Sequence, residues 1–142
     1  MTEFEKLLNM IKNVDPADGA ALDEIDVLVF KYLGDKWGNL WVTMANESIV
    51  YSIAKYTRSR DALKAIRPAG WGYSVQTSVN YKFSIYAKAF KFDPPLTKKQ
   101  CEDKSYKITQ HKFINFESSG KTEELAELHA ILQAIEWDRT NV

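Results

Sequence analysis

The chain has 142 residues, of which 45% are hydrophobic and 13% aromatic, so it is long and apolar enough for one globular domain, and disorder is excluded. Its 19 basic and 19 acidic residues give a formal net charge of zero, which argues against a dedicated nucleic-acid-binding protein. A single cysteine, Cys101, excludes an intrachain disulfide, and no apolar run has the length needed to span a bilayer. We therefore expect a cytoplasmic protein, neither exported nor membrane-bound, with one domain over residues 1–142.

The charges are unevenly distributed along the chain. Residues 1–36 hold eight acids against four lysines, and residues 117–138 hold six acids against one lysine. Between them, residues 55–67 hold five bases against one acid, and residues 82–112 hold eight lysines against three acids. Two interpretations are open: the acidic ends pair with the basic middle, or the basic middle attracts an anionic ligand.

Two amphipathic helices are predicted in the first part of the chain. Thr2 and Glu5 have the spacing of a capping box, and apolar residues at i, i+3, i+4 and i+7 predict a helix over residues 3–13. A second apolar stripe covers residues 22–32, and Gly34 stands where a left-handed residue would end that helix. Because each helix has one apolar face, we expect both to cover a sheet.

The middle of the chain predicts a short helix that turns directly into a strand. Ser59 or Thr57 can cap a helix over residues 60–67. Pro68 bars its continuation, and Gly70 permits the reversal into the following strand. We refer to residues 56–75, which contain this helix, turn and strand, as the central corner.

The remaining strands predict a mainly antiparallel sheet. Residues 37–46 and 49–53 give a weakly patterned hairpin or pair of strands. Residues 81–88 alternate between apolar and polar side chains, as in a half-buried antiparallel strand. After a polar loop, residues 106–116 continue the strands, and a last helix begins after Gly120. The expected fold class is α+β: a single-domain α/β/α sandwich whose mainly antiparallel sheet is covered by helices.

Several short motifs follow one another in a characteristic order. They are ALDE at residues 21–24, Leu33-Gly34, YTRSRDAL at residues 56–63, PAGW at residues 68–71, and an Ala/Leu-rich last helix. In this order they resemble the phage ABA-sandwich family of small phage and prophage proteins, most specifically between Tyr56 and Trp71. The chain departs from the family pattern in the last helix, over residues 128–132, and in a longer lysine-rich insert around residues 94–112. The resemblance implies the fold and a phage or prophage origin, with a location in a host bacterial cell, and it transfers no catalytic residues.

Residues 115–122, NFESSGKT, imitate a phosphate-binding loop. The true motif needs glycine where Asn115 stands, because the backbone must wrap closely around the phosphate. Glu117 would also repel a phosphate. We therefore interpret the segment as the turn that begins the last helix.

Neither a metal site nor a hydrolytic site is predicted. His111, His129 and Cys101 lack the close pairing of a zinc site. Ser118 and Ser119 fall in a predicted polar loop without a nucleophile elbow, so no nucleophile is expected beside a histidine. We expect a protein that is not an enzyme and that uses no metal or cofactor.

The acids of the second helix do not suggest acid–base catalysis either. Asp23, Glu24 and Asp26 fall on the side opposite the apolar stripe, where a charged solvent face is the usual explanation.

The candidate ligand-binding site is the central corner. Arg58 and Arg60 precede a helix N-terminus, where free amides and the helix dipole favour an anion. Tyr56 stands beside them, and Trp71 and Tyr73 follow closely enough to stack on a base or sugar. Guanidinium groups and aromatic faces together suit a nucleotide-like ligand. The alternative is that the aromatic residues only pack the corner and the arginines are solvated.

Three functions remain open from the sequence. The first is a non-catalytic phage accessory protein that binds a nucleotide-like anion, such as a signal of bacterial defence. The second is a structural or interaction module that self-associates or docks on a host or phage protein, using Trp37, Trp41, Tyr51 and Trp137. The third is an enzyme whose site leaves no motif. Convergence of the corner residues on one pocket would favour the first, and an exposed apolar patch would favour the second.

Overall fold

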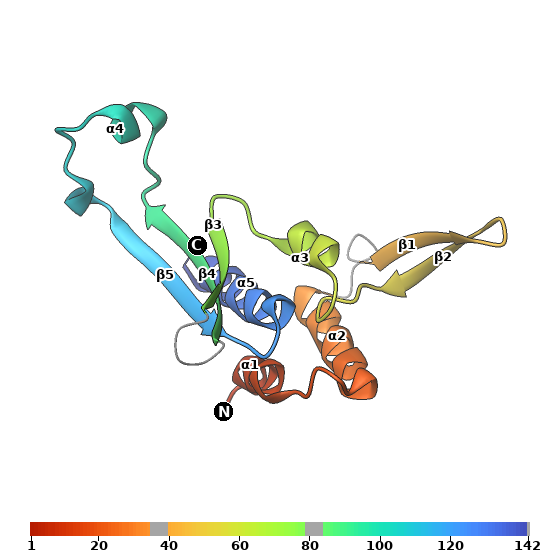
Figure 1. Ribbon diagram of the computed structural model, residues 1–142. Coiled ribbons are helices and arrows are strands. Elements are labelled where there is room, and N and C mark those ends of the chain that lie inside the picture. The colour runs from red at the N-terminus through yellow and green to blue at the C-terminus, as the bar shows by residue number, and fades with distance from the viewer. Residues whose placement is uncertain (35–39, 79–83, 142) are drawn as a thin grey trace.

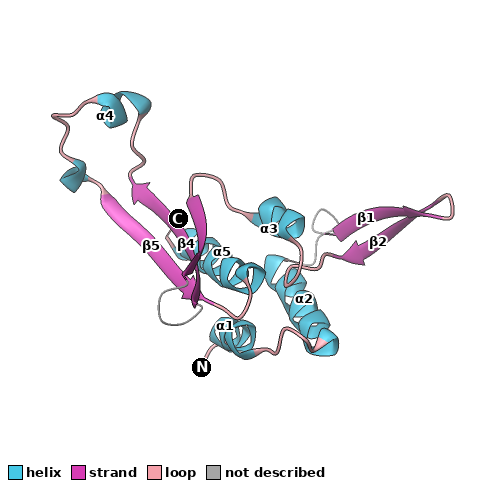
Figure 2. Ribbon diagram, viewed as in Figure 1, coloured by secondary structure: helices cyan, strands magenta, loops and turns pink. Residues whose placement is uncertain are grey.

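The computed structural model describes residues 1–34, 40–78 and 84–141. In chain order the elements of this part are α1 (Glu3–Asn13), α2 (Gly19–Leu33), β1 (Leu40–Ala45), β2 (Ser48–Ile53), α3 (Arg60–Ile66), β3 (Gly72–Ser78), β4 (Ser84–Asp93), α4 (Lys98–Glu102), β5 (Lys112–Ser119) and α5 (Glu123–Thr140). Figure 1 shows a helical body with two extensions, and Figure 2 marks which segments are helices and which are strands.

The helix ends follow the predicted capping residues. Thr2 and Glu5 form the two reciprocal bonds of a capping box at the start of α1, each 3.1 Å long. Ser59, rather than Thr57, caps α3 by accepting a hydrogen bond from a first-turn amide. Gly34 ends α2 with a φ of 110°, a left-handed conformation that glycine adopts without steric cost. Local sequence therefore determines where these helices begin and end.

Strands β3, β4 and β5 form an antiparallel sheet in that order, and α5 packs across it. The buried cluster between them includes Ala87 and Ala89 of β4 and Ala126, Ala130 and Ala134 of α5. These alanines are two residues apart on the strand and four apart on the helix, so each set lies on one face. Their small side chains let the helix approach the sheet closely. The α+β class, with a mainly antiparallel sheet packed against helices, is confirmed.

The other side of α5 faces the remaining helices. Leu125, Leu128, Ile131 and Leu132 join side chains of α1, α2 and α3 in the main core. Helix α5 is therefore buried on two sides, which is why it is apolar around most of its circumference. The two N-terminal helices were expected to cover the sheet directly; instead, α1 packs on α5, and α2 packs on α1 and near the base of β2. An apolar stripe shows which side of a helix is covered, but not which element covers it.

Strands β1 and β2 form a separate antiparallel hairpin that extends away from the body (Figure 1). Among the hairpin side chains that the structure describes, those at the base, near Ile53 and Ala54, pack against the main core. The structure thus confirms a hairpin, which was one of the two alternatives expected for this segment. Residues 37–39 of the predicted first strand lie outside the described residues.

The second extension is the far end of β4 and β5, which is closed by α4 (Figure 1). The predicted polar loop contains α4, which Thr97 caps. The strand predicted at Tyr106 and Ile108 is wrong, because Ile108 begins a short 3-10 turn. The turn brings the Tyr106 hydroxyl within 2.6 Å of His111 Nε2, so the chain folds back on itself here. Residues 81–83 of another predicted strand lie outside the described residues.

Candidate functional site

The first arginine of the central corner is bound by the acids of α2. Arg58 donates a 2.8 Å hydrogen bond to Asp26 Oδ2 and also pairs with Asp23. Its neighbour Tyr56 is a core residue, only 1% exposed. The Asp23 carboxylate has a lowered pKa because Arg58 donates a hydrogen bond to it. This half of the corner therefore joins the chain to α2.

The prediction that Asp26 lies on the solvent side of α2 is wrong. Its side chain is 5% exposed, and its Oδ1 accepts a 2.9 Å bond from the Thr57 amide. A carboxylate can be buried here because a guanidinium and a backbone amide replace its water. Sequence periodicity missed this burial because the partner lies 32 residues away along the chain.

The other three predicted ligand-site residues contact α5 or the turn before β3. Arg60 pairs with Glu123 in the first turn of α5. Trp71 Nε1 donates a 3.0 Å bond to Asp138 near the end of α5, and the Tyr73 hydroxyl donates a 3.1 Å bond to the Pro68 carbonyl. Burial raises the pKa of the Tyr73 hydroxyl. The structure therefore divides the five predicted residues among separate contacts, and their binding of a ligand stays a prediction.

Most ion pairs of the described residues join the basic middle to the acidic ends, the exception being Lys6–Glu3 within α1. The pairs between these regions are Lys55–Asp23, Arg58–Asp23, Arg58–Asp26, Arg60–Glu123, Arg67–Glu127 and Lys91–Asp138. This pattern agrees with the first interpretation of the charge distribution, in which the oppositely charged segments pair. An anion at the corner would have to compete with these carboxylates for the guanidinium groups.

Ser118 does lie beside a histidine, contrary to the sequence analysis. It belongs to β5 instead of a loop, and its Oγ is 2.7 Å from His129 Nδ1 and 2.9 Å from Gln133 Oε1. The hydroxyl donates its proton to the Oε1 atom of Gln133, a residue of α5. The pair is arranged to hold α5 on the sheet.

The described parts of the chain contain neither a cluster of metal-ligating side chains nor a membrane-spanning helix. Within residues 1–34, 40–78 and 84–141, no three His, Cys, Asp or Glu side chains are grouped to hold a metal ion. In the same ranges, no helix combines the length and apolar composition required to cross a bilayer.

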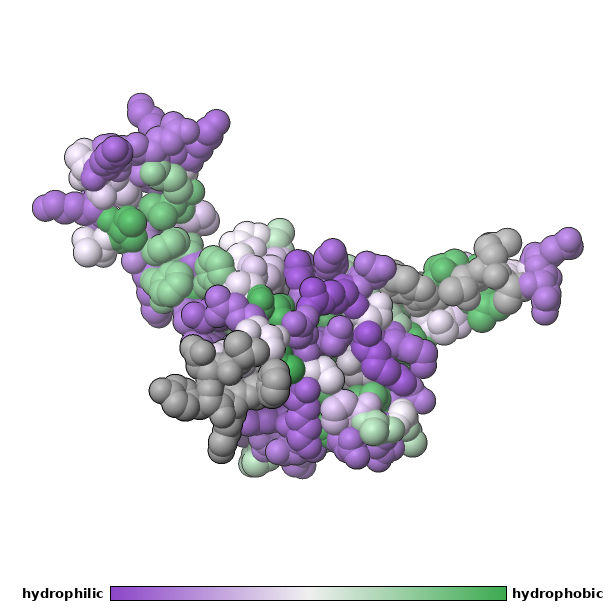
Figure 3. Space-filling view, viewed as in Figure 1, coloured by the Kyte–Doolittle hydropathy of each residue, from purple (hydrophilic) through white to green (hydrophobic). Residues whose placement is uncertain are grey.

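The β1–β2 hairpin carries a row of exposed apolar side chains. The strand register pairs Val42 with Tyr51, and Ile49 lies two residues from Tyr51, so all three lie on one face. Their exposed fractions are 54%, 50% and 58%, respectively. The cross-strand pair Leu40 and Ile53 continues this face towards the core. Figure 3 shows hydrophobic surface along this extension and a hydrophilic tip.

The hairpin turn consists of Asn46 and Glu47. Both have positive φ angles, 49° and 65°, which is the backbone of a two-residue type I′ turn. Glu47 is also the only charged residue between positions 40 and 53. The hairpin therefore has an apolar face and one negative charge at its tip.

The predicted interaction residues lie partly on this hairpin. Tyr51 is on the exposed face, whereas Trp137 packs edge-on against Trp71 in the body. Trp41 belongs to β1, and Trp37 lies outside the described residues. Val42 and Ile49 are not among the interaction residues predicted from the sequence. The signal that points to them is the apolar residue at every second position of both strands.

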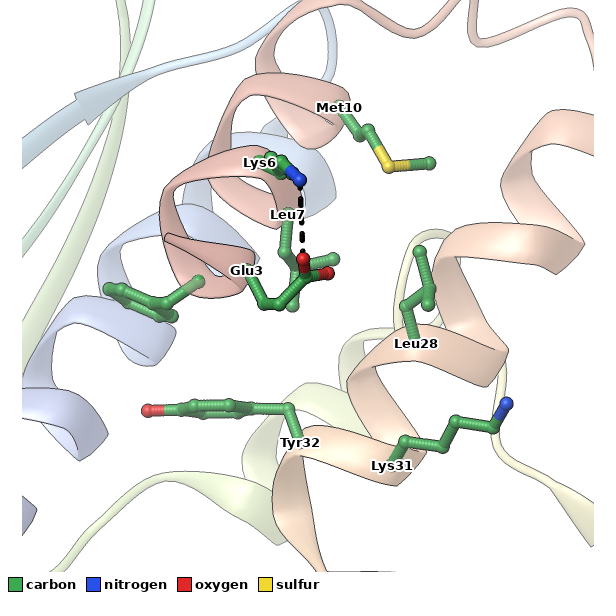
Figure 4. A pocket seen from close by; sticks show the side chains of 8 residues that line it. Glu3, Lys6, Leu7, Met10, Leu28, Lys31 and Tyr32 are labelled. Atoms are coloured by element: carbon green, nitrogen blue, oxygen red, sulfur yellow. Dashed lines mark hydrogen bonds and ion pairs between the residues drawn. The ribbon is translucent and has the colours of Figure 1, made fainter. Parts of the chain in front are cut away.

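A groove of about 400 Å³ lies between α1 and α2. Its apolar lining consists of Phe4, Leu7 and Met10 of α1 and Leu28 and Tyr32 of α2. Figure 4 shows these side chains between the two helices, with Glu3, Lys6 and Lys31 at the rim. We call this feature the α1–α2 groove. Its volume and lining are those of a binding site for an apolar group.

Comparison of the chain with family models, curated proteins and solved structures found no match. The resemblance to the phage ABA-sandwich family therefore stays a prediction, together with the phage origin that it implies. The function has to be inferred from the geometry of the molecule.

Proposed function

We propose that this protein is a non-catalytic interaction module that self-associates through its β1–β2 hairpin. The observation that carries the proposal is the row of Val42, Ile49 and Tyr51 on one face of a hairpin that extends from the body, with Val50 also exposed on the opposite face. Each side chain of the row exposes about half or more of its surface in the single chain. Burying such apolar surface contributes roughly 25 cal/mol per Å², so a partner that covers the row gains stability.

The isolated position of the hairpin and its unprotected strand edges also support the binding of a partner. A two-stranded hairpin without a covering layer is marginally stable in water. Natural proteins protect free strand edges with charges or proline, and the segment 40–53 has only Glu47 for this purpose. A second copy suits this surface because a chain of zero net charge does not repel its own copies.

The test is sedimentation velocity of the wild-type protein over a range of concentrations. We expect concentration-dependent association, which the variant Val42→Ser/Ile49→Ser/Tyr51→Ser loses while its far-UV circular dichroism stays that of the wild type. The matched control is Ile108→Ser, which removes an exposed apolar side chain from the other extension. A wild-type protein that stays monomeric, or a triple variant that associates normally, would refute the proposal.

A further inference from the structure

The α1–α2 groove and the hairpin are complementary parts of the same chain. The groove is a concave apolar surface, and the hairpin is a projecting apolar surface. Figure 1 shows the hairpin extending away from the body of its own chain. When the hairpin of a second copy lies in the groove, both apolar surfaces are buried.

The spacing of the side chains agrees between the two surfaces. Ile49 and Tyr51 are two residues apart on a strand, which separates them by about 7 Å. Leu28 and Tyr32 are four residues apart on α2, which separates them by about 6 Å along the helix axis. Two neighbouring side chains of the hairpin can therefore contact two neighbouring side chains of the groove wall.

The charges of the hairpin and of the groove rim are complementary as well. The one charge of the hairpin is the carboxylate of Glu47 at its tip. Lys6 and Lys31 stand at the groove rim, where Glu3 already pairs with Lys6 at 3.2 Å. The Lys31 ammonium is exposed in the last turn of α2. A carboxylate arriving at this rim meets a positive charge.

We propose that the apolar face of the hairpin of one copy docks in the α1–α2 groove of a second copy, with Glu47 at the lysine rim. This inference rests on the proposed self-association and identifies its acceptor surface. The contact joins two different surfaces, so it forms either a reciprocal dimer with two such contacts or a head-to-tail chain of copies.

The decisive experiment mixes two variants that each lack one surface. The hairpin variant is Ile49→Ser/Tyr51→Ser, and the groove variant is Met10→Gln/Leu28→Gln. Glutamine keeps helix propensity and adds no charge, so α1 and α2 are retained. Each variant alone should sediment as a monomer. An equimolar mixture should form a 1:1 complex, because the intact hairpin of one variant enters the intact groove of the other.

The outcomes separate this inference from the proposed function. A groove variant that still self-associates, with no complex in the mixture, would refute the groove as acceptor and would indicate pairing between hairpins, while self-association itself stands. A wild-type protein that does not associate would refute both. A groove variant that self-associates and also binds the hairpin variant would likewise refute the α1–α2 groove as the acceptor of the hairpin.

A crosslinking measurement covers the case in which the groove variant does not fold. Cys101 is exposed and is the only cysteine, so Cys101→Ser gives a cysteine-free background. In that background, a chain with Ile49→Cys is mixed with a chain with Met10→Cys under glutathione disulfide. The inference expects the mixed disulfide between the two chains in excess over either homodimer. Predominant Ile49→Cys homodimers would overturn it in favour of hairpin–hairpin contact.

Discussion

Arg58 and the buried carboxylate of Asp26 join the central corner to α2. Arg58 donates a 2.8 Å hydrogen bond to Asp26 Oδ2, while Oδ1 of the same carboxylate accepts a 2.9 Å bond from the Thr57 amide. One acid thus binds both the backbone and a side chain of the corner. The arginine that suggested an anion site is occupied by an anion of the protein itself.

Asp26→Ala is expected to destabilise the fold strongly. It removes one partner of a buried pair and leaves the Thr57 amide without an acceptor, which costs on the order of 3 kcal/mol of unfolding free energy. Asp26→Asn should cost less, because its amide oxygen can still accept from Thr57. Urea unfolding followed by circular dichroism measures both values. Equal stability of Asp26→Ala and the wild type would contradict the role of this carboxylate.

The two corner arginines should differ in their effect on stability. Arg58→Ala leaves a buried carboxylate without its cation and should lower the melting temperature clearly. Arg60→Ala removes a pair whose two side chains are 47% and 41% exposed, which costs less than about 1 kcal/mol. Thermal unfolding of the two single variants tests whether Arg58→Ala has the lower melting temperature. A lower melting temperature for Arg60→Ala would contradict the expectation that the more buried pair contributes more stability.

Arg60→Ala is therefore the suitable variant for testing the predicted nucleotide-like ligand. If such an anion binds at the corner, it raises the melting temperature of the wild type in a dose-dependent way. That rise should disappear in Arg60→Ala, whose fold is intact. A rise that persists places the ligand elsewhere, and the absence of any rise across linear and cyclic nucleotides removes the hypothesis.

Gly120→Ala should destabilise the start of α5. A Cβ at Gly120 would lie 2.6 Å from the backbone nitrogen of Ala126, so the helix or the strand end has to move. Overpacking of this kind costs about 1–3 kcal/mol. Gly19→Ala is the matched control, because a Cβ there meets no atom within 4 Å. Chemical denaturation of both variants measures the difference in their unfolding free energies. The close approach of Ala126 also explains why glycine stands at position 120 in the phosphate-loop-like segment 115–122, without any bound phosphate.

His129 should make stability depend on pH. Burial lowers the pKa of His129 in the folded chain, while the unfolded chain titrates near 6.5. The unfolded state therefore binds the proton first, and the free energy of unfolding falls as the pH drops below about 6.5 until the folded pKa is passed. The lowered pKa of Asp23 acts only in a more acidic window. Urea unfolding at pH 7 and pH 5.5 should show this loss in the wild type and a smaller loss in His129→Gln.

The sequence by itself determined the features that depend on neighbouring residues. Capping by Thr2, a cap for α3 at either Ser59 or Thr57, the end of α2 at Gly34 and the α+β class follow from patterns within a few turns or one strand. These patterns reflect local hydrogen bonding and the period of the backbone, which one segment contains completely.

Only the tertiary structure decided which surfaces meet and which stay open. The burial of Asp26 depends on Arg58, 32 residues away, and the burial of α5 on two sides depends on both the sheet and the helices. Periodicity marks Val42 and Ile49 as apolar, but their exposure follows from the hairpin leaving the body. A sequence pattern describes one surface of an element, whereas burial and charge pairing are properties of two surfaces brought together.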